Sequence, residues 1–135
     1  MVKVQGTPIL AHIADAYNAV GIKDIVVVRG YKKEAVNLPN LTYVDNDEYA
    51  QTGELASLLK ALQSRKGRAQ HTIISYGDVL FNKYIPQSLC QEEDDCVIFL
   101  DSNWREETSY ARLGGYAECT VPNSDRKSTR LNSSH

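Results

Sequence analysis

The sequence predicts an α/β fold with a mostly parallel sheet and helices on both faces. Residues 24–29 and 73–76 are apolar runs without alternation, which is typical of strands that are covered on both sides in a parallel sheet. A helical pattern precedes the first run, and another lies between the two. This order of elements is that of βαβ units.

The first helix is predicted to begin at Thr7 and Pro8, because Thr is a good N-cap and Pro suits the first helical position. Gly21 follows where a left-handed residue commonly ends a helix. Apolar residues recur between them at helical spacing: Ile9, Ile13, Tyr17 and Val20. Only residues 2–4 remain for the strand that should precede this helix, and they are too few.

A second short strand is expected at residues 41–44, ended by the turn-forming residues 45–47. Thr52 is then predicted to cap a helix whose leucine stripe belongs to the core: Leu55, Leu58, Leu59 and Leu62. The later elements are expected, in order, as a strand at 71–76, a short helix at 82–89, a strand at 96–101 and the start of a hairpin at 110–119.

Asp78 is the best metal-ligand candidate in the chain. It follows Gly77 directly after a predicted strand, and ligands of open α/β sheets bind at the carboxyl ends of strands. Mg²⁺ is commonly held by one or two carboxylates together with the phosphates of a substrate. The alternative is that Gly77 and Asp78 only form a turn, since both residue types favour turns.

The polar lead-in to the helix at residue 52 is a second candidate site, made of Gln51, Thr52, Gly53 and Glu54. Gly53 would let a ligand approach the backbone, and the helix N-terminus offers N–H groups to an anion or to the edge of a base. A plain helix cap is the alternative interpretation.

Composition favours one ordinary globular domain of 135 residues, 42% of them hydrophobic and 24% charged. No run is apolar enough to span a bilayer, and the N-terminus lacks the apolar stretch of a signal peptide, so a cytoplasmic protein is expected. The formal net charge of −2 gives no electrostatic footprint for nucleic acid. Cys90, Cys96 and Cys119 lack metal-site spacing and are expected to be reduced thiols.

Residues 125–135 are the translation of what looks like a common sequencing-library adapter. We therefore expect residues 1–124 to be the natural part of the chain and exclude the tail from the functional interpretation. Without three basic residues and one Asp, the natural part carries a charge of about −4.

Four blocks together resemble the Rossmann-like nucleotidyltransferases that make sugar-nucleotides and CDP-choline: residues 6–10, 21–31, 46–55 and 76–81. The sequence is most similar to the nucleotidyltransferase domain fused to phosphoenolpyruvate mutase in phosphonate biosynthesis. The resemblance implies that an NTP, with CTP expected, condenses with a phosphonate or phosphate monoester and releases pyrophosphate. Positioning and charge neutralisation by Mg²⁺ and a Lys would carry such a reaction.

The resemblance also implies roles for the candidate residues. Asp78 matches the Mg²⁺ ligand of the family's Gly-Asp motif, and Tyr76 and Gly77 would line the nucleotide pocket. The nucleoside would be held by Gln51, Thr52 and Gly53, with Glu54 near the ribose or base. Acceptor contacts are expected from Asp101, Trp104, Arg105 and Glu107, and a surface loop with a packed Trp is the alternative for this segment.

Two features of the family are missing from the sequence. There is no Gly-rich loop followed by Pro-Lys, and the family's helix-opening Gly-Lys-Pro reads Gly6-Thr7-Pro8. Asp101 is only a substitute for the family's second metal carboxylate. We therefore expect a partial domain that lacks its first strand and its C-terminal part and is inactive alone. The alternative is a non-catalytic nucleotide-binding or regulatory α/β module.

Overall fold

The computed structural model describes residues 1–65, 67, 69–99 and 129–130. The chain divides into two units, Met1–Pro86 and Gln87–His135, and each is described by itself. The candidate residues up to position 78 all belong to the first unit. No helix in the described ranges is long and apolar enough to cross a bilayer.

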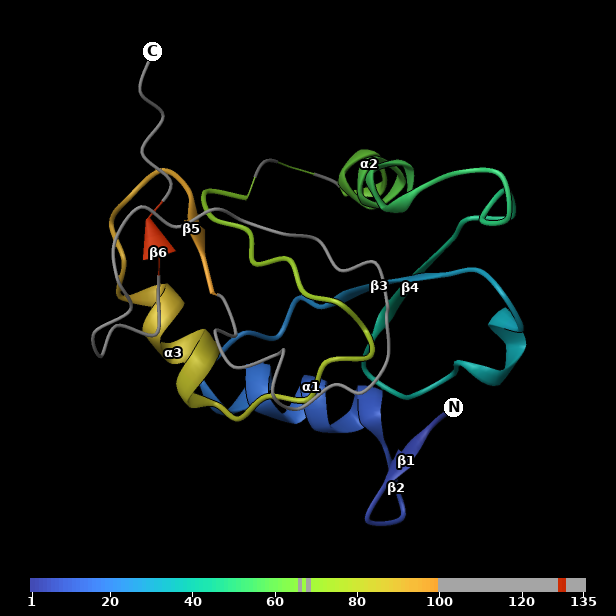
Figure 1. The fold of residues 1–135 in the computed structure, drawn as a ribbon, viewed down its shortest axis with the longest axis horizontal. Coiled ribbons are helices and arrows are strands. Elements are labelled where there is room, and N and C mark those ends of the chain that lie inside the picture. The colour runs from blue at the N-terminus through green and yellow to red at the C-terminus, as the bar shows by residue number, and fades with distance from the viewer. Residues whose placement is uncertain (66, 68, 100–128, 131–135) are drawn as a thin grey trace, which may run out of the picture. The chain divides into compact units, whose positions relative to one another are not determined.

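Two parallel strands form the centre of the first unit (Figure 1): β3 (Val26–Arg29) and β4 (Thr42–Asp45). Their register runs from Val26 opposite Thr42 to Arg29 opposite Asp45. The ladder continues past the last pair, because the Asn46 N–H donates to the Arg29 carbonyl over 2.8 Å. The apolar run at residues 24–29, which shows no alternation of polar and apolar residues, thus contains the parallel strand that the sequence predicts.

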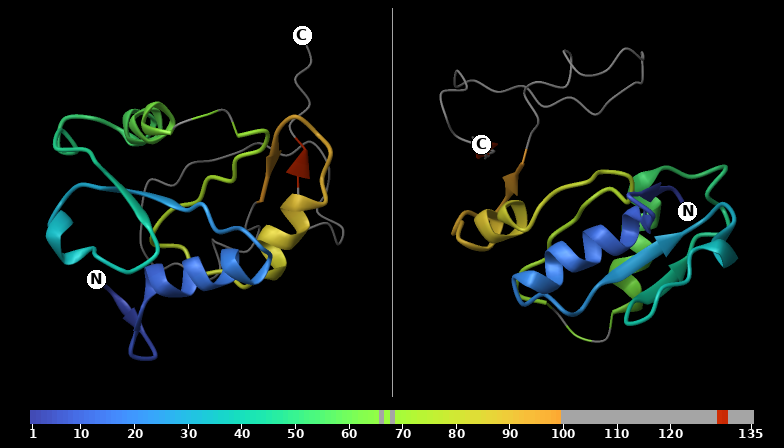
Figure 2. Two further views of the ribbon diagram at one scale, coloured as in Figure 1. Left: turned by 180° about the vertical axis from the view of Figure 1, so that it is seen from behind. Right: turned by 90° about the horizontal axis from the view of Figure 1, so that it is seen from below.

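Helices α1 (Ile9–Ala19) and α2 (Glu54–Ser64) lie on opposite faces of this strand pair, as Figures 1 and 2 show. A short 3₁₀ turn, η1 (Lys33–Ala35), lies in the connection between β3 and β4. The arrangement of a parallel sheet with a helix on each face confirms the predicted α/β fold.

Helix α1 supplies the core of the described residues, namely Leu10, Ile13, Ala14, Ala16 and Tyr17. The Tyr17 ring meets Phe81 edge to face, with ring centroids 5.4 Å apart. The helix ends as predicted at Gly21, whose φ of +87° is left-handed, and the Ile22 N–H bonds back to the Tyr17 carbonyl over 3.0 Å.

The predicted start of α1 is wrong by one residue, since the helix begins at Ile9. Thr7 and Pro8 form strand β2 (Thr7–Pro8), which pairs antiparallel with β1 (Lys3–Val4). The turn between them has positive φ at Gln5 and Gly6, as a two-residue hairpin requires. Thr7 is therefore held extended and makes no cap hydrogen bond, and Pro8 takes the N-cap position.

Two predictions for α2 also need correction. Gly53 occupies the N-cap position, because the Thr52 hydroxyl is bonded within the preceding loop. The leucine stripe is not core: Leu55, Leu59 and Leu62 are 80%, 54% and 47% exposed. Helical spacing alone therefore did not indicate burial here.

The strand predicted at residues 71–76 is absent, since this segment has no regular structure. Its side chains are correspondingly open, with Ile74 64% exposed and Tyr76 57% exposed. A strand needs a neighbouring backbone to satisfy its N–H and C=O groups, and among the described residues β3 pairs with β4 alone. An apolar run without a ladder partner therefore stays irregular.

Helix α3 (Tyr84–Cys90) crosses the division between the two units. It accommodates Pro86 at its third residue, where a helix needs no intrahelical N–H bond. In the second unit, β5 (Val97–Ile98) pairs antiparallel with β6 (Thr129–Arg130). The adapter interpretation of residues 125–135 stays a prediction, and the expected hairpin at 110–119 lies outside the described residues.

Candidate functional site

A buried amide organises the loop that leads from the carboxyl end of β4 into α2. Asn46 is only 1% exposed. Its Nδ2 donates to Thr52 Oγ1 over 3.0 Å and to Ser57 Oγ over 3.1 Å, and its Oδ1 accepts from the Glu48 N–H over 3.2 Å. One side chain thus joins the strand end, the loop and the first turns of the helix.

The loop is closed by its own backbone as well. The N–H groups of Gln51 and Thr52 both donate to the Glu48 carbonyl over 3.0 Å, and the Thr52 hydroxyl donates to the same carbonyl over 2.9 Å. The hydroxyl proton of Thr52 is therefore used inside the loop. The expected contact of Thr52 with a nucleoside stays a prediction.

The face of this loop towards solvent is open at Gly53. A Cβ placed on Gly53 would meet no atom within 4 Å, so a ligand can reach the backbone at this point. The neighbouring residues Gln51 and Glu54 are exposed, while Thr52 is half-buried. Gly53 is also the N-cap of α2, and the first N–H groups of a helix have no acceptor within the helix itself.

The structure brings the two predicted site segments together. The Tyr76 hydroxyl donates to Glu54 Oε2 over 2.9 Å, so the residue before Gly77 touches the first residue of α2. This hydrogen bond and the charge of Glu54 raise the pKa of Tyr76, and the negative charge of Asp78 adds to the effect. The hydrogen bond therefore brings Glu54 to the segment that leads into the turn at Asp78, although Glu54 and Tyr76 are 22 residues apart in the sequence.

Asp78 lies in a turn and is exposed. No group of three or more His, Cys, Asp or Glu side chains among the described residues is arranged to hold a metal ion. Asp78 as a single carboxylate ligand does not fit a metal ion that is enclosed by protein ligands. It fits a hard cation that takes one carboxylate from the protein and its other oxygens from phosphates and water.

A charged cluster at the carboxyl ends of β3 and β4 was missed by sequence reasoning. Arg29 forms a bidentate ion pair with Asp45, in which Nε donates to Oδ1 over 2.7 Å and Nη2 donates to Oδ2 over 3.2 Å. Lys33 lies 2.6 Å from Asp47 Oδ1 and 3.6 Å from Asp45 Oδ2. The hydrogen bond from Arg29 lowers the pKa of Asp45, with further lowering by the charges of Arg29 and Lys33.

The ion pair could have been predicted from the position of Arg29 and Asp45 as the last residues of adjacent strands. That prediction requires the strand register, because a shift by one residue would place the two side chains on opposite faces of the sheet. Since each cation already has a carboxylate partner, the cluster serves to fix the strand ends.

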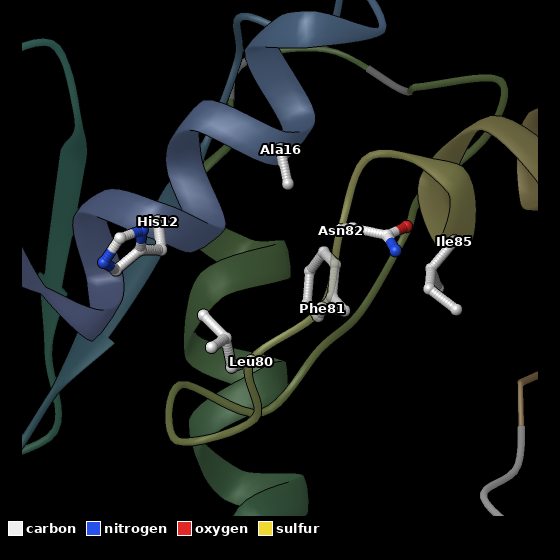
Figure 3. Close-up of a pocket in the computed structure, with 6 residues that line it drawn as sticks. All are labelled: His12, Ala16, Leu80, Phe81, Asn82 and Ile85. Carbon is white, nitrogen blue, oxygen red and sulfur yellow. The ribbon is translucent and has the colours of Figure 1, made fainter. Parts of the chain in front are cut away.

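An open pocket of about 540 Å³ lies elsewhere in the first unit (Figure 3). Its lining comes from α1 and from the segment before and within α3: His12, Ala16, Leu80, Phe81, Asn82 and Ile85. None of the predicted site residues lines it, and His12 Nε2 is within 3.0 Å of the Val4 carbonyl oxygen. The pocket is therefore not the candidate site.

The four predicted acceptor residues, Asp101, Trp104, Arg105 and Glu107, lie outside the described residues, as does Cys119. Cys90 and Cys96 are free and exposed.

Comparison with known proteins gives one result. The sequence matches the MobA-like NTP transferase domain over residues 1–119, whereas no curated protein and no solved structure matches significantly. Nearly the whole chain, including the loop at Asn46 and the turn at Asp78, lies within the match. The chain therefore belongs to the MobA-like NTP transferase domain family.

Proposed function

We propose that the chain is a cytoplasmic nucleotidyltransferase domain that uses CTP to nucleotidylate a phosphonate or phosphate monoester. Its place would be in phosphonate or phospholipid-headgroup metabolism, and in a longer protein it would be fused to a phosphoenolpyruvate mutase domain. Family membership supports nucleotidyl transfer in general. The choice of CTP and of the acceptor comes from the resemblance of residues 6–10, 21–31, 46–55 and 76–81.

The observation that carries the proposal is the hydrogen bond between Tyr76 and Glu54. It joins the loop expected to hold the nucleoside to the turn expected to hold the metal, so both parts of a metal–nucleotide complex can be bound at one place. The open backbone at Gly53 provides the surface that the nucleoside would approach.

In the proposed reaction, an anionic oxygen of the acceptor attacks the α-phosphorus of the NTP. A new P–O bond forms, the bond from the α-phosphorus to the oxygen bridging to the β-phosphate breaks, and pyrophosphate leaves with that electron pair. No proton has to be removed from an oxygen that is already ionised. The protein's task is therefore to align the groups and to offset negative charge.

Members of this family generally use a divalent metal ion. Asp78 would supply its protein ligand, and we propose Mg²⁺ as the ion because the donor set on offer is a carboxylate with phosphate oxygens. The metal would supply charge neutralisation on the triphosphate. Gln51, Thr52 and Gly53 would hold the nucleoside, with Glu54 near the ribose or base. Tyr76 and Gly77 would line the pocket, and Glu54 would also orient Tyr76.

Acceptor binding is proposed for Asp101, Trp104, Arg105 and Glu107, with Arg105 suited to phosphonate oxygens. The sequence contains no Gly-rich loop with a following Pro-Lys to neutralise the triphosphate. We therefore propose that the 135-residue chain binds the nucleotide without measurable turnover, so binding is the property to test.

The test is calorimetric titration of the full chain with CTP, with and without Mg²⁺. We expect binding that requires Mg²⁺ and that weakens at least about tenfold in Asp78→Ala, because even the loss of an outer-shell partner of a metal ligand typically costs about tenfold or more. Asp15→Ala is the matched control, because Asp15 is also an exposed carboxylate but lies on α1. It should bind CTP like the unaltered chain.

A second function, a non-catalytic nucleotide-binding module, would be supported by binding that depends neither on the metal nor on Asp78. Failure to bind any of CTP, UTP, ATP and GTP with Mg²⁺ at millimolar concentration would refute both.

A further inference from the structure

The amide of Asn46 is buried and fully used in hydrogen bonding. Both of its amide protons and one lone pair of its oxygen have partners, and no buried side-chain nitrogen or oxygen in the described residues lacks one. An amide is suited to this place because it donates and accepts at the same time. An apolar replacement would remove the acceptor of the Glu48 N–H and the donor to the hydroxyl oxygens of Thr52 and Ser57.

The neighbours of Asn46 hold the strand end from the other side. Asp45 and Asp47 turn towards Arg29 and Lys33, whereas Asn46 turns towards Thr52 and Ser57. The strand end therefore cannot shift without breaking contacts in both directions. Asn46 binds both ends of the loop, the N–H of Glu48 and the hydroxyl oxygen of Thr52.

We propose that Asn46 is a positioning residue for nucleotide binding. Its amide fixes the loop at residues 48–53 before the ligand arrives, so that the Gly53 backbone and the start of α2 already stand in the binding geometry. This inference rests on the proposed function. Its physical basis is preorganisation: a loop that is ordered in the free protein loses less entropy on binding, and the affinity rises accordingly.

The decisive variant is Asn46→Ala, and Tyr43→Phe is its matched control. The Tyr43 hydroxyl accepts from the Leu38 N–H over 2.6 Å and donates to the Leu38 carbonyl over 3.0 Å. Tyr43→Phe thus also removes side-chain hydrogen bonds to a loop from strand β4, but not to the loop at 48–53. Both full-length variants are compared at a temperature at which circular dichroism shows them folded.

Two quantities are measured. The first, without ligand, is amide hydrogen exchange at Glu48, Gln51 and Thr52, whose N–H groups are bonded within the loop. The second is the affinity for CTP with Mg²⁺. In Asn46→Ala we expect exchange at these amides to accelerate about tenfold and the affinity to fall about tenfold, while α2 stays protected. Tyr43→Phe should change neither quantity.

Equal losses of affinity in Asn46→Ala and Tyr43→Phe would show a general stability effect and overturn the proposal. Unchanged exchange in Asn46→Ala would overturn it as well, and so would faster exchange with unchanged affinity. If Asn46→Ala does not fold, Ser57→Ala removes only one partner of the amide and should give a smaller change of the same kind. Absence of nucleotide binding in the unaltered chain would refute the proposed function, and the exchange data alone would then decide whether Asn46 orders the loop.

Discussion

Replacing Gly30 by Ala should destabilise the first unit by forcing two loops apart. Gly30 follows β3 directly and lies against Tyr49 of the loop after β4. An added Cβ would stand 2.8 Å from Tyr49 Cβ, 2.9 Å from Cγ and 3.1 Å from Cδ1. Because carbon atoms pack at about 3.5–4.0 Å, the two loops would have to separate by about 0.7 Å or more.

The cost follows from what has to move. Tyr49 Cβ is fixed to the backbone, so a rotation of the side chain cannot relieve its contact with the new methyl group. Forcing an extra carbon into a packed site typically costs about 1–3 kcal/mol. With a urea dependence of about 1–3 kcal/mol per M, the midpoint of urea unfolding should fall by about 1 M.

The assay is urea unfolding followed by circular dichroism. Gly77→Ala is the matched control, because a Cβ there would meet nothing within 4 Å, and its midpoint should stay the same or rise slightly. Adding Tyr49→Ala to Gly30→Ala removes two of the three close contacts and should recover part of the loss, as a favourable coupling in a double-mutant cycle. A Gly30→Ala midpoint equal to that of Gly77→Ala would refute the close approach of the two loops.

Two further predictions concern the candidate site and the charged cluster. Gly53→Ala should leave the urea midpoint nearly unchanged, because the φ of −92° at Gly53 suits any residue and the added Cβ would meet no atom within 4 Å. The same variant should weaken CTP binding measured by calorimetry. An unchanged affinity would argue against approach of the ligand to the Gly53 backbone. The pKa of Asp45 is lowered in the folded protein by Arg29, so its contribution to stability is present above the ordinary value of 3.8 and is lost as the pH falls below it. Unfolding midpoints measured through this range should therefore drop more steeply in the unaltered chain than in Asp45→Asn, and parallel curves would contradict the ion pair.

The sequence was sufficient to predict elements whose signal is local. The β-branched run that includes Val26, Val27 and Val28 formed a parallel strand, and α1 ended where Gly21 could take a left-handed conformation. Such features depend on sterics within a few residues, and a single sequence shows them directly.

Features that depend on a partner were not predictable in the same way. Residues 73–76 have the composition of a strand, but β structure needs a second backbone at its side, and no composition shows whether one is available. The leucines of α2 have helical spacing, but spacing indicates one face and does not show what covers it. The pair of Arg29 and Asp45 depends on strand register, which the sequence leaves open.

The segment from Asp45 to Asp47 shows why the contacts that support the candidate loop could not be predicted from the sequence. Successive side chains at a strand end point to opposite sides, so Asp45 and Asp47 reach the cations while Asn46 reaches the start of α2. Moving the register by one residue would turn Asn46 towards Arg29 and bring a carboxylate to the buried position beside Thr52 and Ser57. The charged cluster and the loop geometry therefore depend on the same register, and a change that disturbs one should disturb the other.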